Sequence, residues 1–160
     1  MLLLKRRRRE GRTEHAAAAP IAGTSSRQGN ALSILPGVQE NRIEVDRTSR
    51  DVAVLSVQGE HDVYTAPSIS EQVDSLLGER VPFIIDLTPA TFVDSSVLRV
   101  LLEARRRAEE EGVGFAVALG EDDSGAVRRV LEVTGLIPVL PVHPAKEAAM
   151  QAASSGHGSG

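Results

Sequence analysis

The side chains best suited to chemistry in this sequence are those of Asp94, Ser95 and Ser96, which lie between an apolar run and an amphipathic segment. In open α/β sheets, ligands gather at such strand-to-helix turns. Asp and Ser also cap helices by accepting hydrogen bonds from backbone N–H groups, and the local sequence alone favours this structural role. The two roles are compatible. A serine hydroxyl at a helix N-terminus is exposed, and a phosphate placed there is expected to meet free N–H groups and the positive end of the helix dipole.

Two further polar segments invite a chemical interpretation. The segment Gly59-Glu60-His61-Asp62 combines two carboxylates with an imidazole, a set that suits acid–base chemistry. It suits a polar turn better, in which Gly59 ends a strand and Asp62 orders the loop. Residues 120–125 are acidic, but their spacing matches neither a calcium loop nor a phosphate loop. We interpret them as a loop whose Ser124 caps the next helix.

The sequence does not meet the requirements of common enzyme classes. It contains no cysteine, which removes disulfides, thiolate metal sites and cysteine nucleophiles and suits a reducing compartment. The four histidines are scattered, and no pair has the spacing of metal ligands. Ser95 does not lie in a G-x-S-x-G motif, and neither G-x-G-x-x-G nor a Walker-type loop occurs. We therefore expect no enzyme activity, no metal and no cofactor.

The patterning of apolar residues indicates which elements hold these side chains. Apolar or alternating runs predict strands at 41–45, 52–57, 83–87 and 114–119, and an edge strand at 139–140. Spacings of three and four predict helices at 66–78, 95–111, 124–135 and 145–153, with Thr65 as an N-cap and Gly78 closing the first helix. The first two strands should be antiparallel, because their connection is short, whereas helical crossovers imply parallel pairs. The predicted fold class is α/β: one domain with a mixed β-sheet of four to five strands and about four helices.

The helix at 95–111 has the clearest pattern. Its apolar side chains recur every three or four residues and predict a buried stripe. They are Val97, Leu98, Leu101, Ala104 and Ala108. On its outer face, three arginine–glutamate pairs stand four residues apart: Arg105 with Glu109, Arg106 with Glu110 and Arg107 with Glu111.

The folded unit is predicted to lie between two tails. Residues 1–39 form a basic arm and a linker without periodicity, residues 40–153 form the domain, and residues 154–160 form a flexible tail. The run Lys5-Arg6-Arg7-Arg8-Arg9 suits a nucleic-acid or anionic-membrane arm, but a solvated tail is the favoured interpretation. The apolar start Met1–Leu4 is far too short for a signal sequence or a membrane span. We expect a cytoplasmic protein that makes no direct contact with nucleic acid or membrane.

Several motifs in order resemble one family. Gly59-Glu60-His61-Asp62 followed by Thr65-Ala66 resembles the G-E-[LI]-D-x-x-[TN]-A segment of the anti-sigma-factor antagonists, which are STAS domains. Ile84-Ile85-Asp86-Leu87 and then Phe92-Val93-Asp94-Ser95-Ser96 resemble that family's central signature, in which an apolar strand and D-L precede F-[IVM]-D-S-S-G-L. Thr134-Gly135-Leu136 and Val139-Leu140-Pro141-Val142 match its C-terminal pattern. The resemblance covers about residues 41–153.

The resemblance implies a STAS-like partner-switching module. In such proteins the unphosphorylated antagonist binds an anti-sigma factor, often itself a serine kinase, whose phosphorylation of the antagonist breaks the complex. A phosphatase resets the system. The family's phosphoacceptor is the first serine after the aspartate, here Ser95. The implied partner-binding residues are Glu60, His61, Asp62, Asp94, Ser95, Ser96, Val97 and Arg99.

The sequence departs from the family pattern at Val97 and, less strongly, at His61. Val97 stands where the family has glycine, and a β-branched side chain there is expected to add bulk where a partner's backbone approaches. Arg99 adds a positive charge near the site, and His61 replaces an aliphatic residue. Two other functions remain open at this point: a STAS-like scaffold of a stress-sensing complex, and an accessory subunit of a lipid-transport ATPase.

Overall fold

The computed structural model of the chain describes residues 40–47, 49, 51–122 and 125–156. Within these residues it contains six strands and four helices. The strands are β1 (Arg42–Asp46), β2 (Ala53–His61), β3 (Phe83–Asp86), β4 (Ala90–Val93), β5 (Phe115–Ala118) and β6 (Val142–His143). The helices are α3 (Ala66–Glu79), α4 (Ser95–Glu111), α5 (Ala126–Val133) and α6 (Lys146–Gly156). None of the helices in these residues is both long and apolar enough to cross a membrane.

One mixed sheet organises the domain, and its strand order is β1-β2-β3-β5-β6. Strand β1 pairs antiparallel with β2, as predicted from their short connection. Strands β2, β3, β5 and β6 run parallel. The remaining strand, β4, lies off this path and pairs in parallel with the carboxyl end of β2. The mixed α/β fold class is confirmed, with one strand more than the sequence predicted.

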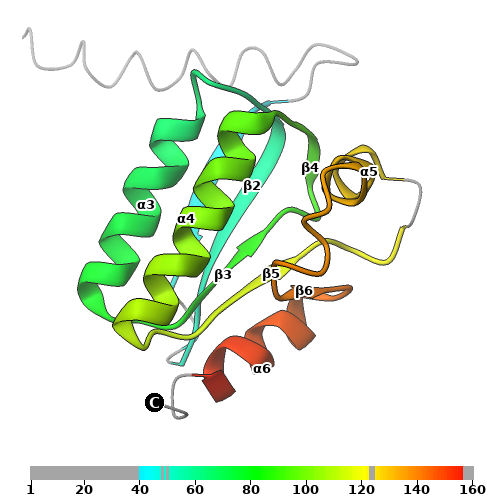
Figure 1. Cartoon of the computed structure of the whole chain (residues 1–160). Coiled ribbons are helices and arrows are strands. Elements are labelled where there is room, and N and C mark those ends of the chain that lie inside the picture. The colour runs from blue at the N-terminus through cyan, green and yellow to red at the C-terminus, as the bar shows by residue number, and fades with distance from the viewer. Residues whose placement is uncertain (1–39, 48, 50, 123–124, 157–160) are drawn as a thin grey trace, which may run out of the picture. The chain divides into compact units, whose positions relative to one another are not determined.

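Helices cover both faces of the sheet. Figure 1 shows α3 and α4 side by side on one face and α6 on the other, while α5 lies near β4. Strand β2 has the alternation that this arrangement requires. Its residues Leu55 and Val57 belong to the larger core cluster under α3 and α4, whereas Val54 belongs to a smaller cluster with Ala149 and Ala153 of α6. The sheet is therefore sandwiched between helices, and its central strands are almost wholly buried.

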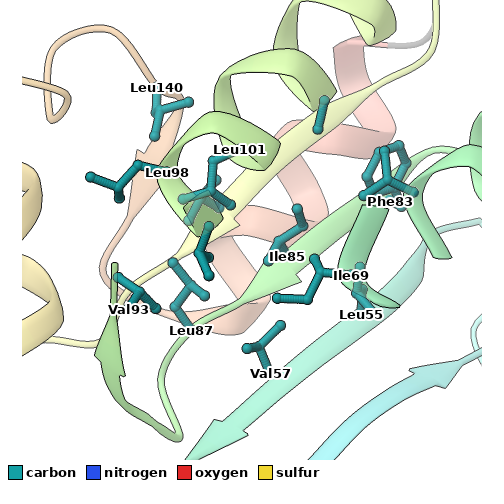
Figure 2. Close-up of a cluster of buried hydrophobic side chains, with 14 of the residues drawn as sticks. Leu55, Val57, Ile69, Phe83, Ile85, Leu87, Val93, Leu98, Leu101 and Leu140 are labelled. Carbon is teal, nitrogen blue, oxygen red and sulfur yellow. The ribbon is translucent and has the colours of Figure 1, made fainter. Parts of the chain in front are cut away.

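The larger core is aliphatic, as the near absence of aromatic residues predicts. In Figure 2, side chains from the strands and from both covering helices meet in one cluster. The labelled members are Leu55, Val57, Ile69, Phe83, Ile85, Leu87, Val93, Leu98, Leu101 and Leu140. All of them are less than 10% exposed, so this cluster fixes how α3 and α4 lie on the sheet.

Helix α4 confirms its prediction residue by residue. It runs from Ser95 to Glu111, its five predicted apolar positions are all buried, and Gly112 ends it in the left-handed region at φ 69°. All three predicted arginine–glutamate pairs form. Arg106 also bonds Glu103, and this hydrogen bond lowers the pKa of the Glu103 carboxyl. Arg107 joins Asp74 of α3, which ties the two helices together at their surface.

Several predicted boundaries are wrong. Strand β2 does not end at Gly59 but continues through His61, because its far end gains β4 as a new neighbour. Gly59 lies within the strand at φ 90°, and the register with β4 shifts between Gly59 and Glu60. Here glycine allows an irregularity inside the strand, a conformation that other residues reach only with strain.

Three other elements also differ from prediction. No strand forms at Val139–Leu140; instead Leu140 enters the core and β6 begins at Val142, which pairs with Val117. Helix α3 ends at Glu79 rather than Gly78, with Arg80 in the left-handed region at φ 58°. Helix α6 runs to Gly156, three residues beyond its expected end. Residues 1–39, most of the predicted flexible tail and the capping residue Ser124 lie outside the described residues.

Candidate functional site

The polar segments 59–62 and 94–96 meet at one end of the sheet. Strands β2 and β4 run in parallel, so their carboxyl ends lie together, and His61 pairs with Val93 at the last position of the register. The next residue, Asp94, donates its backbone N–H to the carbonyl oxygen of His61 at 3.2 Å. Helix α3 follows β2 and helix α4 follows β4, so both helix N-termini open at this edge.

Asp94 caps α4. Its Oδ1 accepts hydrogen bonds from the backbone N–H groups of Ser96, at 2.8 Å, and Val97, at 3.3 Å. Its carbonyl oxygen accepts from Leu98 at 3.1 Å. The capping role is confirmed, but it changes one expectation. The N–H groups of Ser96 and Val97 are already taken by a carboxylate, so this helix end offers a phosphate fewer free donors than expected.

Ser95 is the first residue of α4, and its side chain is exposed. Ser96 is half-buried beside it. A serine with an exposed hydroxyl at a capped helix start can be reached by an enzyme without unfolding the helix. Ser95 therefore has the accessibility that a modification site needs, and Ser96 has less.

Asp62 orders the turn between β2 and α3, as predicted. Its Oδ1 accepts from the backbone N–H of Tyr64 at 2.9 Å, and its carbonyl oxygen accepts from Ala66 at 2.8 Å. Thr65 occupies the N-cap position, but its hydroxyl does not cap the helix. Its Oγ1 instead accepts from the N–H of Asp62 at 2.9 Å. These bonds hold the turn rigidly against the edge of the site.

Two residues predicted to contact a partner are buried. His61 is 1% exposed; its Nε2 lies 2.8 Å from the carbonyl oxygen of Gln58, and its Nδ1 has no partner among the described residues. Val97 is 0% exposed and points into the core. The bulk that Val97 was expected to add at the partner surface is therefore inside the protein. Glu60, by contrast, is exposed, as is Arg99.

Apolar side chains that the sequence analysis passed over are exposed in the same segments. Tyr64 is 87% exposed, Val63 56% and Phe92 45%. Val63 also borders a shallow groove of about 260 Å³ between the first turns of α3 and α4. The groove is lined by Val63, Ala66, Pro67, Ser70, Ser96, Arg99 and Val100. The signal in the sequence was that Val63-Tyr64 and Phe92 lie between the strands and helices that the sequence predicts, where no buried stripe needs them.

The side chains exposed at this edge suit a binding surface. Among the described residues, no three histidine or acidic side chains cluster closely enough to hold a metal ion. His61 is buried, and the carboxylate of Asp94 is engaged with backbone N–H groups. The edge presents to solvent Ser95, the side chains of Val63, Tyr64 and Phe92, and the charged Glu60 and Arg99.

Known proteins resemble this chain over the same region. The family model described as the STAS domain matches residues 42–149. The anti-sigma-B factor antagonist of Listeria monocytogenes is 31% identical over 104 residues, which cover 62% of this chain and 86% of that protein. The anti-sigma-F factor antagonist RsfB of Mycobacterium tuberculosis is 33% identical over 87 residues, 53% of this chain and 67% of that protein.

A solved structure supports the same assignment. The crystal structure of an anti-sigma factor antagonist from Mycobacterium paratuberculosis superposes with a TM-score of 0.62 at 29% identity, covering 70% of this chain and 92% of that one. The family match spans all six strands and the helices α3, α4 and α5. The chain belongs to the STAS domain family.

Proposed function

We propose that this chain is an anti-sigma-factor antagonist whose binding to an anti-sigma factor is ended by phosphorylation of Ser95. The observation that carries the proposal is the exposure of Ser95 at the start of α4, at the edge of the sheet that also carries the exposed apolar side chains Val63, Tyr64 and Phe92. The names of the relatives supply the class of partner. In this proposal the chain is a binding module and not an enzyme, and it acts in the cytoplasm.

The unmodified site suits a protein interface. Exposed apolar side chains on one edge mark such interfaces, and aromatic residues such as Tyr64 are frequent anchors in them. Tyr64 and Val63 lie on a turn held by the hydrogen bonds of Asp62, so little conformational entropy is lost when a partner covers them. The Ser95 hydroxyl is uncharged and can be covered by a partner at small cost.

Phosphorylation changes this balance. The kinase transfers the γ-phosphoryl group of ATP to Ser95 Oγ. The bond to ADP breaks, ADP is released, and the hydroxyl proton is lost. The modification adds a charge of about −1.5 to −2 beside the carboxylate of Asp94. A partner that covered the neutral hydroxyl would then have to remove water from a phosphate that stands beside the Asp94 carboxylate, which costs several kcal/mol. The kinase is proposed to be the anti-sigma factor itself, and a phosphatase restores the hydroxyl.

Co-purification from the cells that make this protein tests the proposal. The full chain and its Ser95→Asp variant are each used to capture binding proteins, which mass spectrometry then identifies. We expect an anti-sigma factor with the wild-type chain and its loss with Ser95→Asp. A matched control is Ser154→Asp, which adds the same charge to an exposed serine of α6, the helix on the opposite face of the sheet (Figure 1). Capture of other STAS proteins or of a transporter ATPase would contradict the proposal in favour of a scaffold or an accessory subunit.

A further inference from the structure

Arg99 differs from every other arginine on α4. Arg105, Arg106 and Arg107 each pair with an acidic side chain on the helix surface. Within the part of the chain that the structure describes, Arg99 makes no ion pair and no side-chain hydrogen bond, although its side chain is exposed. A cation left unpaired on an otherwise fully paired helix is available to an anion from elsewhere.

The position of Arg99 limits where that anion can lie. Side chains on an α-helix lean towards the N-terminus, so residue 99 lies over the turn that carries Ser95 and Ser96. Consistently, the guanidinium-bearing side chain lines the groove between α3 and α4 together with Ser96 and the apolar residues Val63, Pro67 and Val100. The groove thus offers one free positive charge with an apolar surround, which is complementary to a carboxylate carried next to an apolar side chain.

Ser95 and Arg99 are four residues apart, the spacing at which helical side chains meet. An anion at the N-terminal member and a cation at the C-terminal member is also the more favourable order. A phosphoryl group on Ser95 needs such a counter-charge, because the N–H groups of Ser96 and Val97 already bond Asp94 and the Asp94 carboxylate itself repels the phosphate. Arg99 is the basic side chain that this helix places one turn away.

We propose that Arg99 couples the state of Ser95 to partner binding by changing its ion-pair partner. With Ser95 unmodified, Arg99 pairs in the groove with a carboxylate of the anti-sigma factor. With Ser95 phosphorylated, the phosphate forms an ion pair with the Arg99 guanidinium on the same helix. The partner's carboxylate then loses its ion pair with Arg99. This inference rests on the proposed function and adds to it the residue that responds to the phosphate.

The test compares the full chain with its Arg99→Gln variant, each with and without phosphate on Ser95. The matched control is Arg129→Gln on α5, which removes the same charge from an exposed arginine that has no ion pair among the described residues. Binding to the anti-sigma factor captured above is measured by calorimetry. We expect Arg99→Gln to weaken binding of the unmodified chain by about tenfold and Arg129→Gln to leave it within twofold. Phosphorylation should reduce the affinity of Arg99→Gln by a smaller factor than that of the wild type.

The ion pair between phosphorylated Ser95 and Arg99 can be measured in the absence of the anti-sigma factor. A ³¹P titration of phosphorylated Ser95 should give a second pKa about 0.3 or more lower in the wild type than in Arg99→Gln, because a nearby guanidinium favours the dianion. Equal ³¹P titrations, or an equal loss of affinity on phosphorylation in both chains, would overturn the inference while leaving the proposed function intact. Phosphorylation that changes affinity in neither chain would overturn the proposed function as well.

Discussion

The backbone N–H of Asp94 donates to the carbonyl oxygen of His61 at 3.2 Å, so the residue that caps α4 is held by the last residue of β2. This bond joins the two motifs that lie far apart in the sequence, and it places the N-terminus of α4 at the edge of the sheet. The side chain of Asp94 then fixes the first turn of the helix, on which Ser95 stands.

Replacing Asp94 with alanine removes the cap of α4. We expect Asp94→Ala to lower the free energy of unfolding by about 1 kcal/mol, because the N–H groups of Ser96 and Val97 lose their acceptor. Asp94→Asn keeps an oxygen acceptor and should recover most of this loss. Urea unfolding of both variants measures the difference, and equal stability of the two would show that the hydrogen bonds do not matter.

Two glycines should respond to alanine in opposite directions. A Cβ on Gly114 would overlap the carbonyl oxygen of Ala153, so Gly114→Ala should push α6 from the sheet and cost about 2 kcal/mol or more. Gly78 lies exposed in α3, and apart from its chain neighbours and the nearby backbone of its own helix, no atom of the described residues lies within 4 Å of the place that a methyl group would take. Gly78→Ala should therefore stabilise the protein by about 0.5–1 kcal/mol. Thermal unfolding of the two variants checks the contrast. A Gly114→Ala protein as stable as wild type would contradict the close packing of α6.

Because His61 is buried, its substitution should affect the stability of the protein and not its affinity for the anti-sigma factor. His61→Leu removes a buried nitrogen that lacks a partner among the described residues, together with one hydrogen bond to Gln58, so its stability should stay within about 1 kcal/mol of wild type. His61→Ala leaves a cavity and should cost about 2–4 kcal/mol. Because the side chain is 1% exposed, His61→Leu should bind the anti-sigma factor with unchanged affinity. A tenfold loss of affinity in this variant, without loss of stability, would place His61 in the interface.

The sequence predicted helix α4 in full because its information is local. Five apolar positions at helical spacing, three charge pairs and a terminal glycine all lie within one segment. Strand β4 was missed for the opposite reason. It has four residues, of which only Val93 is buried, and it forms by pairing with the end of β2, about thirty residues earlier in the chain. The same pairing extends β2 beyond Gly59, although the local sequence predicts that the strand ends at this glycine.

The candidate site was predicted in part. Asp62 and Asp94 order their turns as their residue types indicate, and Ser95 is exposed at the start of its helix. The burial of Val97 followed from its place in the apolar stripe of α4, although the resemblance assigned it to the partner surface. The burial of His61 could not be deduced, because the end of β2 is covered only when distant segments pack on it.

Substitutions at Ser95 separate charge from shape. Ser95→Ala removes only a hydroxyl and should keep both the native circular dichroism and the partner. Ser95→Asp should keep the circular dichroism and weaken binding, although less than phosphate does, since it adds one charge and Asp94 is already anionic. Calorimetry of both variants checks this order. Loss of binding in Ser95→Ala would show that the hydroxyl itself is needed by the partner.

The most direct test of the central claim is the affinity of the anti-sigma factor for the full chain phosphorylated at Ser95, measured by calorimetry against the unmodified chain. Circular dichroism of the two forms should agree, because the modified residue is exposed on the first turn of α4. We predict that phosphorylation weakens binding at least about a hundredfold, which corresponds to about 2.7 kcal/mol. Equal affinity of the two forms would contradict the account.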